Sequence, residues 1–221
     1  SSAASDVYKR QPSNNTFIGS WGDKSGTGHH AEVYQTATGN RPKYYSTDMN
    51  SKPTVKFDGS NDLLIVKNGR SDFQGWDKVS VFMVYEDWGT SSNWRRVIGC
   101  GEGDGGGWCL LWRSATQCTF RLIGTSATDD STINGTRSGI HLVSMSYDGA
   151  SRTFTLDGTS TTFTDTGAIP VLSTGDMVIG ASGRSSGTPG GVTKMKLSEL
   201  LVFRDGICLL YTSPSPRDGD E

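Results

Sequence analysis

The chain has 221 residues, with 21 Lys and Arg against 23 Asp and Glu and a formal net charge of −2 at pH 7. This length fits one domain that buries a hydrophobic core, and the near balance of charge argues against the basic stripe of a nucleic-acid-binding protein. No apolar run approaches the roughly 20 residues that a membrane-spanning helix needs. The abundance of Gly, Ser and Thr favours strands and turns over long helices.

The two ends of the chain match the in-frame translations of sequencing adapters. Residues 1–11 correspond to a widely used transposase adapter, and residues 208–218 correspond to its opposite partner, followed by residues 219–221 from an index barcode. Such segments are set aside before fold reasoning. We interpret residues 12–207 as a metagenomic fragment truncated at both ends, and residues 1–11 and 208–221 as non-native. The alternative is a natural flexible tail at each end.

Strand-like alternation of apolar and polar residues runs through the rest of the chain. The expected strands are 54–57, 63–66, 79–85, 95–99, 108–112, 118–123, 141–147, 152–156, 177–179 and 194–203. Segment 79–85 is almost continuously apolar, which predicts a strand covered on both faces. Turn signals about every ten residues between short strands predict an all-β fold, namely a two-sheet antiparallel jelly-roll sandwich.

Four motifs follow one another in a fixed order. They are Trp21-Gly22-Asp23-Lys24-Ser25-Gly26, then Lys52-Pro53-Thr54-Val55-Lys56-Phe57-Asp58-Gly59, then Tyr147-Asp148-Gly149, and last Leu197-Ser198-Glu199-Leu200-Leu201-Val202-Phe203. This series resembles the laminin-G-like family of concanavalin A-like lectin/glucanase jelly rolls, found in secreted bacterial and phage structural proteins. The resemblance covers nearly all of residues 12–207. It lacks the family's first strand and the stretch after the last one, which predicts an exposed sheet edge.

Catalysis would require groups that the sequence does not place together. Glycoside hydrolysis uses two carboxylates about 5–10 Å apart, and related β-glucanases carry them as Glu-x-Asp-x-Glu on one strand. The glutamates of residues 12–207 lie in no such motif; they are Glu32, Glu86, Glu102 and Glu199. The polysaccharide lyases of this fold use a cluster of Arg, Gln, His and Tyr, and no such motif surrounds His141. We therefore predict a domain that is not an enzyme, with a divergent glycan-active enzyme as an alternative.

A tight acidic turn at residues 58–62 is a candidate calcium site. Calcium prefers six to eight oxygen ligands from carboxylates, amides and backbone carbonyls, and Asp58, Asn61 and Asp62 supply several of them. Related sandwiches often carry structural calcium near such a turn. The alternative is that Asp58 and Asn61 only cap the turn through backbone amides.

Tryptophans provide the candidate ligand-binding surface, because an aromatic ring stacks on the apolar face of a sugar. Trp88 and Trp94 lie in or beside a polar loop, and Arg95 adjoins them, which predicts one exposed binding face. Trp108 and Trp112 share one face of a strand and belong either to the core or to a second binding surface.

These observations predict a recognition module of a secreted or virion protein that binds a glycan or another surface ligand, with possible help from calcium. The competing hypothesis is a structural or adhesion domain of a phage fibre or cell-surface protein without a sugar site. Cys109 and Cys118 either bridge a hairpin or remain buried free thiols.

Overall fold

The computed structural model describes residues 12–34, 38–66, 78–89, 93–101, 107–123, 128–164, 176–182, 190–204 and 207–212, with the backbone alone from residue 204 onward. In this part of the chain, nine strands form one sheet, sheet A, and eight form the other, sheet B. A single short 3-10 turn, Thr38–Asn40, interrupts the strands described here. No helix in the described ranges has the length and apolar character that a membrane crossing requires.

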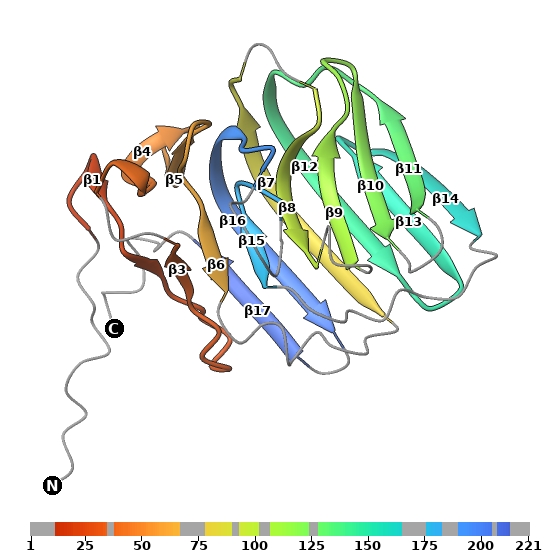
Figure 1. Ribbon diagram of the computed structural model, residues 1–221, viewed down its shortest axis with the longest axis horizontal. Coiled ribbons are helices and arrows are strands. Elements are labelled where there is room, and N and C mark those ends of the chain that lie inside the picture. Colours follow the sequence, from red (N-terminus) through yellow and green to blue (C-terminus); the bar gives the residue numbers. More distant parts are fainter. Residues whose placement is uncertain are drawn as a thin grey trace, which may run out of the picture.

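Sheet A combines strands from both halves of the sequence. Its order in space is β1 (Thr16–Phe17), β4 (Lys43–Met49), β5 (Lys52–Asp58), β16 (Lys194–Arg204), β7 (Val79–Asp87), β12 (Gly139–Tyr147), β13 (Ser151–Leu156) and β14 (Thr159–Thr164), and β17 (Ile207–Thr212) also pairs with β16. Figure 1 shows β1 and β4 at one end of the sandwich and β14 at the other.

Sheet B packs against sheet A to complete the sandwich. Its order is β11 (Thr128–Asn134), β10 (Gln117–Ile123), β9 (Gly107–Trp112), β8 (Arg95–Cys100), β15 (Met177–Ile179), β6 (Leu64–Val66), β3 (Ala31–Val33) and β2 (Ser20–Trp21). The strand pairs of both sheets are antiparallel. The predicted all-β, two-sheet antiparallel jelly-roll sandwich is therefore confirmed.

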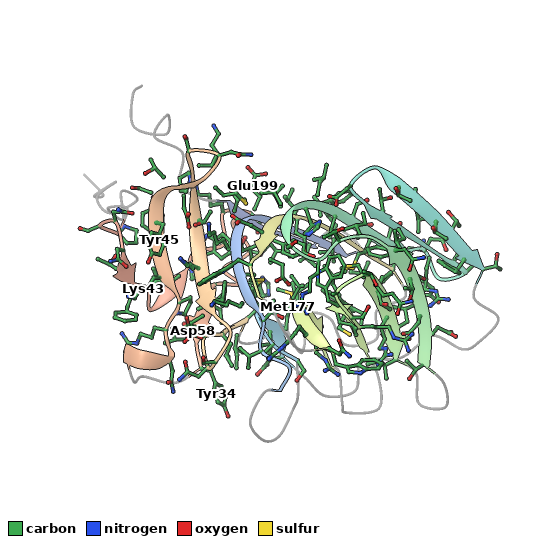
Figure 2. The ribbon with its side chains drawn as sticks, turned by 90° about the horizontal axis from the view of Figure 1, so that it is seen from above. Tyr34, Lys43, Tyr45, Asp58, Met177 and Glu199 are labelled. Carbon is green, nitrogen blue, oxygen red and sulfur yellow. The ribbon has the colours of Figure 1, made fainter. Side chains whose placement is uncertain are left out.

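The core lies between the two sheets and is continuous from one end of the sandwich to the other. The largest side chains that it buries completely include Trp108, Trp112, Tyr85, Phe57 and Phe120. Met177 lies inside the sandwich in Figure 2, whereas Glu199 and Tyr34 lie on its outside. Below, the outer face of a sheet means the face turned away from this core.

The predicted coverage of residues 79–85 on both faces is wrong. In β7 the buried side chains alternate with partly or fully exposed ones, and Phe82 is 43% exposed on the outer face of sheet A. Both faces are buried in β9, where Cys109 and Leu111 are as inaccessible as the core tryptophans, and also in the short strands β6 and β15. A short apolar run shows only that the side chains are hydrophobic, while the neighbouring elements decide which face is covered.

Strand β17 continues the hydrogen bonding of β16 where its pairing with β5 ends. β5 pairs with residues 194–197 of β16, and β17 pairs with residues 199–204. This is an edge position of the kind that the truncated family pattern predicts to be vacant. The origin of residues 208–212 in an adapter stays a prediction.

Several strands escaped sequence analysis, notably β4, β11 and β14. In β14 every described side chain is at least partly exposed, and in β11 the buried side chains are Ser131 and Ile133. Such strands carry little periodic apolar signal, and their neighbours in the sheet determine their conformation. The predicted strands 141–147 and 152–156 are confirmed and pair as a hairpin, with Val143 opposite Leu156 and Met145 opposite Phe154.

Cys100, Cys109 and Cys118 are buried free thiols, in agreement with one of the two alternatives. Cys118 faces the core opposite Trp112, whereas Cys109 pairs with Arg121 on the outer face of sheet B. Because the two cysteines project from opposite faces of the sheet, they cannot form the hairpin disulfide.

Candidate functional site

An aromatic and arginine cluster lies on the outer face of sheet B. Trp94 immediately precedes β8, and its ring centroid lies 4.9 Å from Cζ of Arg113 and 5.0 Å from Cζ of Arg121. Arg121 donates hydrogen bonds of 2.7 and 2.8 Å to Asp130 on the neighbouring strand, and Arg113 donates one of 3.2 Å to the same carboxylate. We call Trp94, Arg113, Arg121 and Asp130 the Trp94 cluster.

Both guanidinium groups of the Trp94 cluster lie over the indole and share one carboxylate oxygen. Nη1 of Arg113 and Nη2 of Arg121 contact Oδ2 of Asp130 at 3.2 and 2.8 Å, which holds the two cations beside each other. Trp94 is 40% exposed, so part of its ring remains accessible to solvent.

The backbone of Trp94 is held in a conformation that bulky residues rarely adopt. Its φ is +64°, in the left-handed region, which costs roughly 1–2 kcal/mol for a residue with a side chain. Arg96 Nη1 donates a 2.8 Å hydrogen bond to the Trp94 carbonyl, and the Arg96 amide donates to the Gly191 carbonyl. Strain of this kind is concentrated at functional sites, where the fold holds a side chain in place for binding.

Trp88 lies apart from the Trp94 cluster, on the outer face of sheet A. Nζ of Lys194 lies 3.8 Å and Nζ of Lys56 4.3 Å from its ring centroid, and Lys56 also lies over Tyr45. The single face predicted for Trp88, Trp94 and Arg95 is therefore divided between two sheets. Nη1 of Arg95 donates a hydrogen bond to the backbone carbonyl of Val192.

Trp108 and Trp112 are both inaccessible to solvent in the core. Nε1 of Trp112 donates a 2.8 Å hydrogen bond to the hydroxyl of Tyr85 across the sandwich. As placed, neither ring reaches a ligand at the surface, so the structure corresponds to the packing alternative for these two residues.

The acidic turn at residues 58–62 hydrogen-bonds to itself. Asp58 Oδ1 accepts from the amides of Ser60, Asn61 and Asp62, at 2.7, 3.3 and 3.4 Å. Asp62 Oδ2 accepts from the Asp58 amide at 2.9 Å, and Asn61 Nδ2 donates to Asn40. Burial, together with the nearby Asp58 carboxylate, raises the pKa of Asp62 to about 6.

This turn therefore has the capping geometry, and it also gathers oxygens that a hard cation can use. In the described ranges, no group of three or more His, Cys, Asp or Glu side chains is arranged to hold a metal. Calcium would have to draw on backbone and amide oxygens besides Asp58 and Asp62.

A buried polar network that sequence analysis missed lies beside the core. His141 Nδ1 is 2.8 Å from Oδ2 of Asp157, and Nε2 is 2.8 Å from the carbonyl of Arg137. Each ring nitrogen of His141 therefore faces a hydrogen-bond acceptor, a carboxylate on one side and a backbone carbonyl on the other. The side chain of Arg137 faces Asp87 at 3.8 Å and donates to the Gly89 carbonyl.

The surroundings of His141 indicate a structural role for this network. Its ring contacts the rings of Tyr85 and Trp112, and the residue is 3% exposed. Burial raises the pKa of Asp87, partly offset by the Gly89 amide and by Arg137. Its sequence signal is faint, because Arg137 and Asp157 lie in turns whose burial depends on the packing of both sheets.

Comparison with known proteins identifies the architecture. No family model matches the sequence, and no curated protein matches it either. A domain of the Ruminococcus gnavus IT-sialidase, CBM40, superposes with a TM-score of 0.53 at 11% identity, covering 74% of this chain and 89% of that one. Domain 4 of AbnA, an extracellular GH43 arabinanase from Geobacillus stearothermophilus, solved with arabinotriose, gives 0.52 at 11% identity over 77% of each chain.

The fold is a jelly-roll sandwich. Mouse laminin α1 domains LG4-5 also match, with a TM-score of 0.46 at 10% identity over 65% of this chain and 42% of that one. At 11% identity, the two matches with TM-scores above 0.5 show the fold alone, and the function has to be argued from the site.

Proposed function

We propose that this domain is a non-catalytic recognition module that binds a glycan at the Trp94 cluster. The observation that carries the proposal is Trp94, whose side chain is 40% exposed and contacts Arg113 and Arg121, and whose backbone is strained. A partly exposed indole suits the apolar face of a sugar ring, and the adjacent guanidinium groups suit its hydroxyls.

The matched structures support the same class of ligand and location. One is a domain of an extracellular arabinanase solved with arabinotriose, and the other is a domain of a sialidase. We place this domain accordingly in an extracellular, cell-surface or virion protein whose partner is a glycan.

The environments of Glu86, Asp87 and Asp157 support a role without catalysis. Glu86 Oε2 lies 3.0 Å from Nζ of Lys196, which also binds Asp48 at 2.9 Å. Asp87 lies 3.8 Å from Nε of the buried Arg137, and Asp157, which is 47% exposed, lies 2.8 Å from Nδ1 of His141. A hydrolytic pair would need one carboxyl group positioned as an acid and another as base or nucleophile at a substrate cleft.

Substitution of Trp94 tests the glycan site. We expect dissociation constants between tens of micromolar and millimolar for the best glycans of a panel, as is usual for an open site. Trp94→Ala should weaken this binding by about tenfold or more, since about 1.4 kcal/mol corresponds to a factor of ten. Isothermal titration calorimetry and ligand-observed NMR provide the measurement.

Trp88→Ala is the matched control, because Trp88 also lies against two cations but on the other sheet. Binding that is lost in Trp88→Ala and kept in Trp94→Ala would move the site to sheet A. Release of reducing sugar from any bound glycan would contradict the non-catalytic role.

An apolar patch on the outer face of sheet A favours a second function, a structural or adhesion role. Phe82, Ile140, Leu142 and Phe203 are each more than a third exposed, and the rings of Phe82 and Phe203 are in edge contact with centroids 6.0 Å apart. Contiguous exposed apolar side chains often pack against another protein. Failure of every glycan to bind the wild-type domain would favour this second function.

We also propose that calcium binds the folded domain at the turn of residues 58–62. Binding to the native state alone stabilises by RT ln(1 + [L]/Kd), so saturating calcium should add about 1–3 kcal/mol to the free energy of unfolding. Because the pKa of Asp62 is raised to about 6, this carboxyl group destabilises the calcium-free fold as pH rises from about 4 to 6. Calcium requires the ionised carboxylate, so its effect should be larger at pH 7 than at pH 5.

Thermal melts in calcium and in EDTA at both pH values measure this effect. Asp62→Ala should abolish it, whereas Asp148→Ala should retain it, since Asp148 caps a comparable turn through the amides of Ala150 and Ser151. Coincident melts of the wild-type domain in both buffers would leave the turn with its capping role only.

A further inference from the structure

The Trp94 cluster and the whole chain carry charges of opposite sign. Arg113 and Arg121 share a single carboxylate, Asp130, and Arg96 donates a hydrogen bond to the Trp94 carbonyl. The two guanidinium groups and one carboxylate of the cluster sum to +1, in a chain whose net charge is −2. Such a local excess attracts anions despite the overall charge.

The two arginines of the cluster differ in how they use their donors. Arg121 directs both Nε and Nη2 to Asp130, and its side chain is 15% exposed. Arg113 gives Asp130 a single contact through Nη1, and its side chain is 37% exposed. A guanidinium group carries five N–H donors in a planar fork, so Arg113 retains donors with access to solvent beside the ring.

From this arrangement we infer that the Trp94 cluster selects an acidic oligosaccharide, with Arg113 binding a carboxylate or sulfate group of the sugar. The inference rests on the proposed glycan function and adds the ligand class. The planar guanidinium matches both anions through paired hydrogen bonds. Arg121, held by two bonds to Asp130, positions the cation pair and leaves the ligand contact to Arg113.

The geometry also bears on the size of the ligand. A sugar stacked on the accessible surface of the indole lies about 3.5–4.0 Å from the ring, and the Cζ atom of Arg113 lies 4.9 Å from the ring centroid. A second, linked sugar unit can reach Arg113 while the first unit occupies the indole, so we expect the ligand to contain at least two linked sugars.

Calorimetry with matched ligands tests the selection for an acid. The probes are a uronic acid trisaccharide, its methyl ester, the free uronic acid monosaccharide and a sulfated neutral trisaccharide. At low ionic strength the acidic trisaccharide should bind tenfold to a hundredfold more tightly than its uncharged ester, as expected for charge-assisted hydrogen bonds. The difference should shrink at 0.3 M salt, because the site is partly exposed, and the monosaccharide should bind at least tenfold more weakly than the trisaccharide.

Arg113→Gln should abolish the preference for the acid, so that the acid and the ester bind with similar affinity through the indole that remains. Lys56→Gln is the matched control, since Lys56 lies over Trp88 on the opposite sheet, and it should retain the preference. Tight binding of the sulfated trisaccharide as well would identify a general anion site, whereas binding of the uronate alone would restrict the ligand to carboxylates.

The outcomes separate this inference from the proposed function. Equal, Trp94-dependent binding of acid and ester would uphold the glycan function and overturn the selection for acids. A preference for the acid that persists in Arg113→Gln but disappears in Lys56→Gln would place the anion site on sheet A and overturn the inference. The absence of binding by every probe and every neutral glycan would overturn both.

Discussion

Replacing Arg137 with methionine is expected to lower the free energy of unfolding by about 3–5 kcal/mol at pH 7. The substitution removes the cation that faces Asp87, and the side chains of this pair are 6% and 2% exposed. It leaves a buried carboxylate whose remaining partner in this region includes the Gly89 amide, at 2.8 Å. It also removes the hydrogen bond from Arg137 to the Gly89 carbonyl.

The pH dependence of this loss has a defined sign. Burial already raises the pKa of Asp87, and loss of Arg137 removes one of the charges that lower it. In the variant the folded state therefore retains a proton that the unfolded state releases, so stability falls as pH rises above the ordinary range of an aspartate. The deficit relative to wild type should be smaller at pH 4.5 than at pH 7.

Denaturant unfolding at both pH values provides the measurement, and Arg113→Met provides the matched control. Arg113 also pairs with an aspartate but is 37% exposed, so its loss should cost no more than about 1 kcal/mol. Adding Asp87→Asn to Arg137→Met should recover part of the lost stability. Similar losses in Arg137→Met and Arg113→Met would show that the burial of Asp87 carries little weight.

Replacing Trp112 with alanine should also lower the free energy of unfolding by about 3–5 kcal/mol, because the substitution leaves a cavity in the centre of the core. Trp112 is completely buried and donates to the Tyr85 hydroxyl, which is itself buried. The indole therefore contributes both packing volume and one hydrogen bond across the two sheets.

Phenylalanine substitutions separate these two contributions. Trp108 is equally buried, but its Nε1 has no hydrogen-bond partner among the residues that the structure describes. Trp112→Phe should therefore lower the free energy of unfolding by about 1–3 kcal/mol more than Trp108→Phe does, because it removes the hydrogen-bond donor to the Tyr85 hydroxyl. Chemical denaturation of both variants, with glycan binding measured in parallel, gives the comparison; equal costs would indicate that the hydrogen bond across the core adds nothing.

Local sequence patterns were sufficient for the strands with a regular alternation. The strands of residues 141–147 and 152–156 were predicted, because one face of each strand carries apolar side chains at every second position, and the structure pairs them as a hairpin. The same reasoning predicted that Trp108 and Trp112 share a face. It left open what covers that face, because coverage depends on the opposite sheet.

Proximity in sequence was a poor guide to the site. Trp88 and Trp94 are six positions apart, yet Trp88 lies against Lys56 and Lys194 of sheet A, and Trp94 lies against arginines of sheet B. The chain passes from one sheet to the other between them, so side chains from the same loop end on opposite sides of the sandwich.

The sequence by itself determined the all-β class and the position of the most regular strands, because alternation with a period of two is a local property of the chain. Only the tertiary structure decided where a ligand can bind. The Trp94 cluster forms because β9, β10 and β11 are adjacent in sheet B. Trp94, immediately before β8, lies against Arg113 and Arg121 of this sheet. That arrangement depends on strand order and on which face of each strand meets the core, and neither is encoded within any one segment.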